Sequence, residues 1–175
     1  MRDLLILRHG ETTWNWDGRL QGSLDAPLTA LGRVQAARQG AILRALGGGR
    51  PVFGSPQGRA RATAALAGLR PHLAPDLREI ELGAWEGRLL ADVDPTPGLG
   101  WKFEAPGGET LAAFTGRLEA FLARCPPRAI LVTHGVVAVG LRGCLAGLPP
   151  KEWDRLSDVQ GVVFRVTDDA ETMLT

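Results

Sequence analysis

Two stretches of the sequence decide the fold: residues 4–10, which read LLILRHG, and residues 129–135, which read AILVTHG. Each begins with four consecutive apolar residues, which is the length of a strand buried on both faces. Each then ends on a histidine followed by a glycine. Strands of this kind form parallel sheets covered by helices, so the two stretches predict an α/β fold.

The rest of the chain alternates between apolar runs and segments with helical spacing. Residues 71–106 are predicted to be mostly loop with short helical pieces, because their second half is rich in Pro, Gly and Asp. The alternation indicates one domain over residues 1–175, with a three-layer α/β/α architecture and a mostly parallel sheet. Further strands are predicted at residues 51–53 and 162–166, and helices at 30–46, with Thr29 as the N-cap, at 58–69, at 109–124 and at 135–145.

Composition and charge exclude several classes of function. The 175 residues carry 20 Lys and Arg against 19 Asp and Glu, a net charge of +1. This balance lacks the excess of positive charge that is typical of nucleic-acid-binding domains. The short apolar run at the N-terminus is too short for a signal peptide or a membrane span. The two cysteines fit no metal or redox spacing. We therefore expect a cytoplasmic protein that binds neither nucleic acid nor membranes.

The histidines at the two strand ends are the strongest indication of a site. Ligands of open α/β sheets bind at the carboxyl ends of the strands, where His9 and His134 are predicted to lie. Arg8 belongs to an otherwise apolar strand, and a buried guanidinium needs either a protein carboxylate or a ligand anion. Arg59 lies at the start of a predicted helix, where anions are favoured, whereas Arg61 is read as a surface residue.

Five ordered motifs, spread over about residues 4 to 166, resemble those of the histidine phosphatase superfamily, which has the phosphoglycerate mutase-like fold. They are residues 7–12 (LRHGET) with Asn15 six positions after His9, 55–64 (SPQGRARATA), 77–87 (LREIELGAWEG), 106–110 (PGGET) and 132–135 (VTHG).

The resemblance implies a catalytic set. His9 would attack phosphorus as a neutral imidazole and form a phosphohistidine. Arg8, Arg59 and His134 would bind the phosphoryl oxygens, and the two arginines would lower the pKa of His9 by repelling an imidazolium. Glu79 would be the general acid and base.

The proton donor cannot be chosen from residue types alone. Glu11, Glu79, Glu81 and Glu86 all compete for this role, and the family pattern is what points to Glu79. Glu11 is expected to brace the first loop instead.

Substrate contacts are expected from residues near the same strand ends. Asn15 and Gln21 would donate hydrogen bonds, and the backbones of Gly22 and Gly135 would face the ligand. The cationic pocket would take the place of a metal ion, so no metal and no other cofactor are expected. The only expected ligand is a small phosphate ester, and a homodimer is compatible with the sequence.

Several functions are compatible with these motifs. The chain resembles phosphatases, and the sequences of its motifs are similar to those of α-ribazole-5′-phosphate phosphatases of cobalamin biosynthesis. The alternatives are a broad-specificity phosphatase, a phosphoglycerate mutase, a non-catalytic phospholigand-binding domain, and a metal-dependent hydrolase that uses His9, Glu11 and His134. Four side chains are candidates for an apolar wall around the leaving group, with packing as the competing interpretation: Trp16, Leu89, Trp101 and Phe103.

Overall fold

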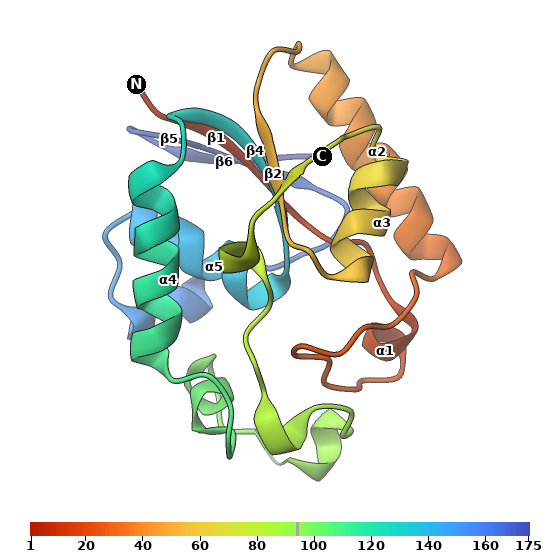
Figure 1. Cartoon of the computed structure of the whole chain (residues 1–175), viewed down its shortest axis with the longest axis vertical. Helices are drawn as coiled ribbons and strands as arrows, with labels where there is room; N and C mark the ends of the chain where they lie inside the picture. The colour runs from red at the N-terminus through yellow and green to blue at the C-terminus, as the bar shows by residue number, and fades with distance from the viewer. Residues whose placement is uncertain (94) are drawn as a thin grey trace.

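A computed structural model of the chain describes residues 1–93 and 95–175. Its centre is a six-stranded sheet of order β3-β2-β4-β1-β5-β6 (Figure 1). The first four strands in this order are parallel, and β5 and β6 run antiparallel at one edge. The strand bounds are β1 Asp3–Arg8, β2 Val52–Gly54, β3 His72–Leu73, β4 Arg128–Thr133, β5 Val163–Thr167 and β6 Glu171–Leu174.

Helices cover both faces of this sheet. Thr29 and Thr110 cap the N-termini of α2 and α4, since each side-chain oxygen accepts a hydrogen bond from a backbone N–H three residues later. The helices are α1 Thr13–Trp16, α2 Ala30–Ala45, α3 Gly58–Leu66, α4 Leu111–Arg124 and α5 Gly135–Leu145; the 3-10 turns are η1 Pro75–Leu77, η2 Gly83–Trp85, η3 Leu90–Asp92, η4 Gly100–Glu104 and η5 Pro150–Arg155.

The alternation of side chains along β1 divides the core into two layers. Leu4 and Ile6 pack with α4 and α5 on one face. Leu5 and Leu7 pack with α2 and α3 on the other face. All four side chains are at most 1% exposed, so the strand is buried on both sides as its apolar run predicts. The predicted α/β/α architecture is confirmed.

Short elements are where structure and prediction differ. The sequence does not predict the strands β3 and β6, because β3 is two exposed residues and β6 is largely exposed. The one-turn helix α1 precedes the first predicted helix and is not itself predicted, and Thr12 and Asn15 cap it reciprocally. The helix predicted over residues 58–69 ends at Leu66, and Gly68 follows it with a left-handed φ of 77°.

The register of β1 and β4 brings the two histidines together. Arg8 pairs with Thr133, and the backbone N–H of His9 donates to the carbonyl of Thr133 at 2.9 Å. The residues that follow the two strands therefore leave the sheet side by side. The segment containing η2, η3 and η4 lies beyond these strand ends, at the bottom of Figure 1.

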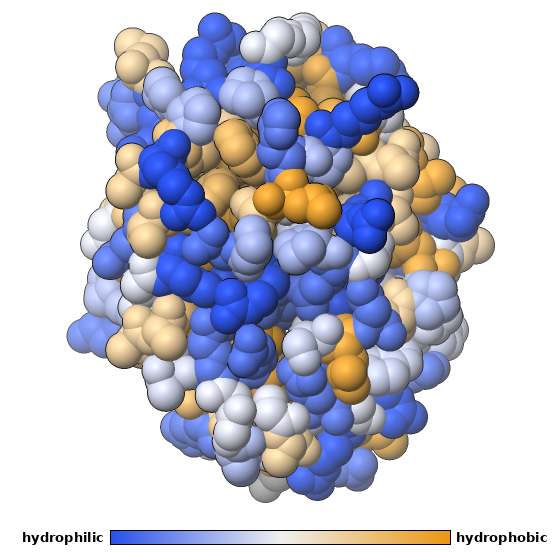
Figure 2. Space-filling model, in the orientation of Figure 1, coloured by the Kyte–Doolittle hydropathy of each residue, from blue (hydrophilic) through white to orange (hydrophobic). Residues whose placement is uncertain are grey.

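The surface of the described residues is mixed. On the face in Figure 2, hydrophobic residues form small groups among hydrophilic ones. None of the described helices combines the length and the hydropathy needed to cross a membrane.

Candidate active site

His9 lies directly after β1 and is 2% exposed. Its Nδ1 lies 2.8 Å from the carbonyl oxygen of Gly10, an acceptor, so Nδ1 carries the proton. In the neutral ring the lone pair is then on Nε2, which makes no hydrogen bond within the described residues. The imidazole is thus held in the tautomer that a nucleophile requires.

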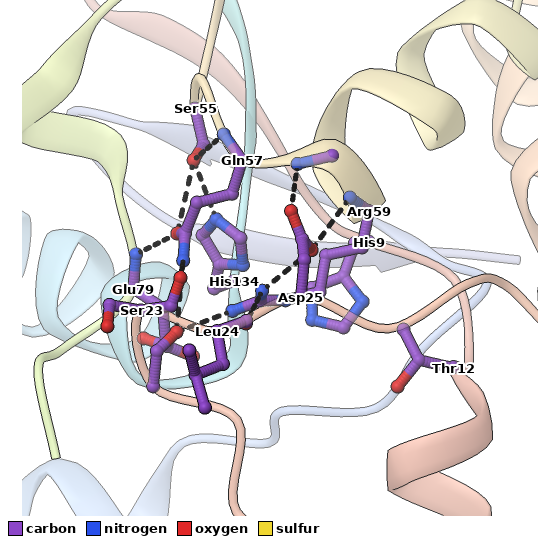
Figure 3. A network of polar contacts seen from close by, with 12 residues as sticks. His9, Thr12, Ser23, Leu24, Asp25, Ser55, Gln57, Arg59, Glu79 and His134 are labelled. Carbon is purple, nitrogen blue, oxygen red and sulfur yellow. Dashed lines mark hydrogen bonds and ion pairs between the residues drawn. The ribbon is translucent and has the colours of Figure 1, made fainter. Parts of the chain in front are cut away.

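His134 lies after β4 and is fully buried. Its ring centroid is 5.2 Å from that of His9, and the two planes are inclined by 60°. Its Nε2 lies 2.7 Å from the hydroxyl oxygen of Ser55, whereas its Nδ1 is buried with no partner among the described residues (Figure 3). A buried nitrogen without a partner among the described residues is unusual, and a ligand is one group that would satisfy it.

Two arginines approach His9 from different elements. Arg59 in α3 donates to Asp25 Oδ1 at 2.9 Å and to the carbonyls of Leu24 and Gly22 (Figure 3). Arg8 at the end of β1 donates to the Asp158 carboxylate at 2.9 Å. The Nε atoms of both arginines are buried without a partner in the described residues, so each guanidinium keeps a donor for an anion.

The environment keeps both imidazoles neutral. Burial is the main cause that lowers the pKa of His9 well below its usual 6.5, and the charges of Arg8 and Arg59 lower it further. Burial likewise lowers the pKa of His134 well below 6.5, with Arg59 as the next contribution. A neutral His9 therefore persists below the pH at which a free histidine is protonated.

One of the four candidate glutamates faces the cavity beside His9. Glu79 lines it, and its carboxylate accepts from the backbone N–H of Ile80 at 3.0 Å and of Val136 at 3.3 Å. Glu11 accepts from the Thr29 hydroxyl at the start of α2.

The remaining two glutamates are engaged elsewhere. Glu81 pairs with Arg78. Glu86 accepts from the backbone and hydroxyl of Ser23 and from the backbone of Leu82, and so ties two loops together.

The predicted substrate contacts also reach the cavity. Asn15 uses its Oδ1 to accept from Thr12 and Gln160, which leaves its amide hydrogens as donors. Gln21 is nearly buried, and its Oε1 has no partner in the described residues. Gly135 lines the cavity, and a Cβ there would lie 3.2 Å from Cζ of Arg8.

Two glycines serve packing needs that the sequence does not reveal. A Cβ on Gly10 would lie 2.2 Å from the carbonyl oxygen of Gly32, so this glycine lets α2 approach the β1 loop. Gly22 lines the cavity, but its φ is 55° and a Cβ would lie 2.2 Å from Glu86. Its carbonyl, rather than its N–H, is engaged, because Arg59 and Gln57 both donate to it.

The cavity has a volume of about 100 Å³. His134 is not among its lining residues and lies behind it, next to His9. A larger cavity of about 560 Å³ lies between α4 and the end of α5 and contains no histidine. Predicted site residues that line the smaller cavity are Arg8, His9, Asn15, Gln21, Gly22, Arg59, Glu79 and Gly135.

Several residues at the site are not singled out by the sequence. Asp25 and Asp158 balance the two arginines, and Ser55 contacts His134. Gln57 accepts from the backbone N–H of Glu79 through Oε1, which positions the carboxylate. For Arg8 the sequence indicates either a protein carboxylate or a ligand anion as partner, and it does not show where in the chain such a carboxylate lies.

The proposed apolar wall is wrong. None of Trp16, Leu89, Trp101 and Phe103 lines the cavity. Trp16 is 77% exposed, whereas Trp101 is buried and packs against Trp85, with the ring centroids 5.7 Å apart and the planes inclined by 39°. Trp101 and Phe103 therefore serve packing, since Phe103 contacts Phe114 edge-on, whereas Trp16 is mostly exposed to solvent.

A metal site built from His9, Glu11 and His134 does not fit the geometry. The Glu11 carboxylate accepts from the Thr29 hydroxyl, and Glu11 is not among the residues that line the cavity beside His9. Within residues 1–93 and 95–175, no three His, Cys, Asp or Glu side chains are grouped as metal ligands.

Comparison with known proteins identifies the family of the chain. Residues 4–173 match the model of the histidine phosphatase superfamily (branch 1). The chain is similar to the probable phosphoglycerate mutase GpmB of Salmonella paratyphi C, with 33% identity over 85% of this chain and 77% of that protein. The chain belongs to the histidine phosphatase superfamily, and the resemblance seen in its motifs is confirmed.

Solved structures show the same fold. Phosphoglycerate mutase from Thermus thermophilus is 39% identical, with a TM-score of 0.73 over 94% of this chain and 92% of that one. Rv3214 from Mycobacterium tuberculosis is 29% identical, with a TM-score of 0.85 over 99% and 96% of the two chains. The fold is therefore phosphoglycerate mutase-like.

Proposed function

We propose that this protein is a phosphomonoesterase that hydrolyses a small phosphorylated metabolite through a phosphohistidine on His9. The observation that supports this most is the free Nε2 of a neutral, buried His9 in a cavity that also holds Arg8, Arg59 and Glu79. A nucleophile, cationic donors and a proton donor are the groups that phosphoryl transfer requires.

In the first step Nε2 of His9 attacks phosphorus in line with the leaving oxygen. The N–P bond forms as the P–O bond to the alcohol breaks, and Glu79 in its carboxylic acid form gives its proton to the leaving oxygen. The Gly10 carbonyl accepts the hydrogen bond of Nδ1–H and stabilises the positive charge that the ring acquires.

In the second step water attacks the phosphohistidine. The Glu79 carboxylate takes a proton from this water, the N–P bond breaks, and its electron pair returns to His9. Inorganic phosphate leaves, and both residues are again in their starting states. The same Glu79 side chain therefore serves as acid and then as base. Its hydrogen bonds from the backbone N–H groups of Ile80 and Val136 keep it in one position for both steps.

Charge-assisted hydrogen bonds would stabilise the transferred phosphoryl group. Arg8, Arg59 and Nδ1–H of His134 would each donate to the phosphoryl oxygens, and such charge-assisted bonds contribute about 1.5–3 kcal/mol each. For His134 this requires the proton on Nδ1, so the Ser55 hydroxyl donates to Nε2. Their unpartnered buried nitrogens support this assignment.

Two substrates are candidates for the reaction. α-Ribazole 5′-phosphate is implied by the motif wording, and a cytoplasmic role in cobalamin biosynthesis would follow. Phosphoglycerate is favoured by the names of the relatives, and with it a mutase activity. None of the four apolar-wall candidates lines the cavity, so the predicted wall gives α-ribazole 5′-phosphate no support.

Phosphate release tests the proposal. α-Ribazole 5′-phosphate, 3-phosphoglycerate and p-nitrophenyl phosphate are compared by kcat/KM, with and without EDTA. We expect inorganic phosphate from at least one of them, at a rate that EDTA does not change. Conversion of 3-phosphoglycerate into its isomer without net phosphate would show a mutase, and binding without turnover would show a phospholigand-binding domain.

A further inference from the structure

Four cations line the catalytic cavity, and they differ in how they are paired. Arg8 pairs with Asp158, Arg59 pairs with Asp25, and Arg19 donates to the Gly87 carbonyl. Lys102 is the fourth, and within the described residues its ammonium makes no hydrogen bond or ion pair. It is one of only two lysines in the chain.

Lys102 reaches the cavity from the turns beyond the strand ends rather than from the sheet. It belongs to η4, within the segment that lies beyond the strand ends (Figure 1). Its Nζ lies 5.5 Å from the centroid of the Trp101 ring, a cation–π contact that positions the ammonium without using any of its three N–H donors. Trp101 is in turn buried and packs against Trp85.

The side of the cavity matters for what Lys102 would bind. The groups assigned to the phosphoryl oxygens come from the ends of β1 and β4 and from α3. The leaving alcohol must lie on the side of Glu79, which protonates it. Lys102 and Glu79 line the same cavity. Burial lowers the pKa of Lys102; the charge of Glu79 opposes this most, followed by that of Asp158, whereas Arg8 lowers the pKa further, so the ammonium lies between the Glu79 carboxylate and the Arg8–Asp158 pair.

We propose that Lys102 is a specificity-determining residue that binds an anionic group, such as a carboxylate, on the alcohol part of the substrate. An ammonium placed in a cavity without a partner is unfavourable until an anion pairs with it. This inference rests on the proposed function and narrows its substrate to phosphate esters whose alcohol carries a second negative charge. α-Ribazole 5′-phosphate lies outside this class.

A pair of matched ligands tests the inference by binding alone. 3-Phosphoglycerate and glycerol 3-phosphate share a carbon skeleton and differ by a carboxylate against a hydroxymethyl group. Their Kd values are measured by calorimetry in the His9→Asn background, where no turnover disturbs the equilibrium. We expect Lys102→Met to weaken 3-phosphoglycerate relative to glycerol 3-phosphate by about 10- to 100-fold, the size of one lost charge-assisted hydrogen bond.

Two controls make the result specific. Lys102→Arg keeps the charge and should retain most of the preference for the carboxylate. Lys151→Met removes the other lysine, which lies on η5 outside this cavity, and should leave the ratio of Kd values unchanged. An unchanged ratio in Lys102→Met, whether both ligands weaken equally or neither does, would overturn the inference.

The proposed function is judged separately from this result. It fails if the wild-type protein releases no phosphate from any ester, whereas the Kd ratio still reports whether Lys102 binds the second anion.

Discussion

The ends of β1 and β4 are alike in sequence, but their histidines differ in which ring nitrogen is hydrogen-bonded. Each presents a buried histidine followed by a glycine, and burial holds the pKa of both rings low. At the β1 end Nδ1 is bonded to the Gly10 carbonyl, whereas at the β4 end Nε2 is bonded to Ser55. In the proposed mechanism, the hydrogen bond on the ring nitrogen that faces away from the phosphoryl group sets whether each histidine offers a lone pair or an N–H.

The largest expected effect separates the two ends. We expect His9→Asn to lower kcat by about 10⁴-fold or more, because the covalent route is lost. Single-turnover rates of phosphate release measure this. A His9→Asn enzyme that kept a tenth of the wild-type rate would show that β1 does not supply the nucleophile.

Glu79 contacts the β4 end, because its carboxylate accepts a hydrogen bond from the backbone N–H of Val136 in α5. Glu79→Gln should lower kcat by about 10²- to 10⁴-fold for an alkyl phosphate, because a carboxamide gives no proton to the leaving oxygen. The loss should be smaller with p-nitrophenyl phosphate, whose phenolate leaves unprotonated.

Glu81→Gln is the matched control for Glu79. It makes the same change two residues further on, at a side chain paired with Arg78, and should leave kcat within about threefold of wild type. Equal losses in the two variants would remove Glu79 from its role.

A smaller effect is expected at His134 itself. We expect His134→Asn to lower kcat by about 10²- to 10³-fold, the usual loss of one preorganised donor, while the phosphohistidine still forms on His9. Steady-state rates with p-nitrophenyl phosphate measure the loss. A loss as large as that of His9→Asn would contradict the division of roles between the strand ends.

The sequence predicts the site residues that lie next to a recognisable local pattern. It does not predict those that are brought in from distant parts of the chain. The sequence places His9 and His134, each with its glycine, at the ends of strands. Each histidine comes shortly after a four-residue apolar run, and a buried strand ends where polar residues begin. Asp25 and Asp158 meet Arg59 and Arg8 across many residues of chain, and no local pattern records such pairings.

The same reasoning explains the fold. Long elements with strong patterns are predicted to within a few residues, and α5 has its predicted bounds, residues 135–145. The strands β3 and β6 owe their existence to pairing with a neighbouring strand and have no buried run of their own.

Ser55 tests the hydrogen bond that distinguishes the β4 end. We expect Ser55→Ala to lower kcat by about 10-fold, because Nε2 of His134 loses its partner and the ring is no longer held in one tautomer. Ser23→Ala, at an exposed hydroxyl bonded to Glu86, is the matched control and should have a smaller effect. Indistinguishable rates for Ser55→Ala and wild type would show that the tautomer is fixed by something else.

The smallest effect is a shift in pH dependence at the β1 end. Burial, then Arg8 and then Arg59 lower the pKa of His9, so the nucleophile stays neutral and active below pH 6.5. Removing one positive charge in Arg8→Gln raises this pKa, and the acidic limb of the single-turnover rate must move to higher pH. Arg61→Gln, at an exposed position of α3, should leave the limb in place. A limb that moved to lower pH in Arg8→Gln would reverse the assigned electrostatics.

The most direct test of the central claim is to trap the intermediate. Enzyme mixed with phosphate-labelled substrate is quenched within milliseconds, and the label is located after digestion with trypsin, which separates residues 9–19 from residues 129–142. We predict an acid-labile, base-stable label on the peptide of residues 9–19 that disappears in His9→Asn. An acid-stable label, or a label on residues 129–142, would contradict the account.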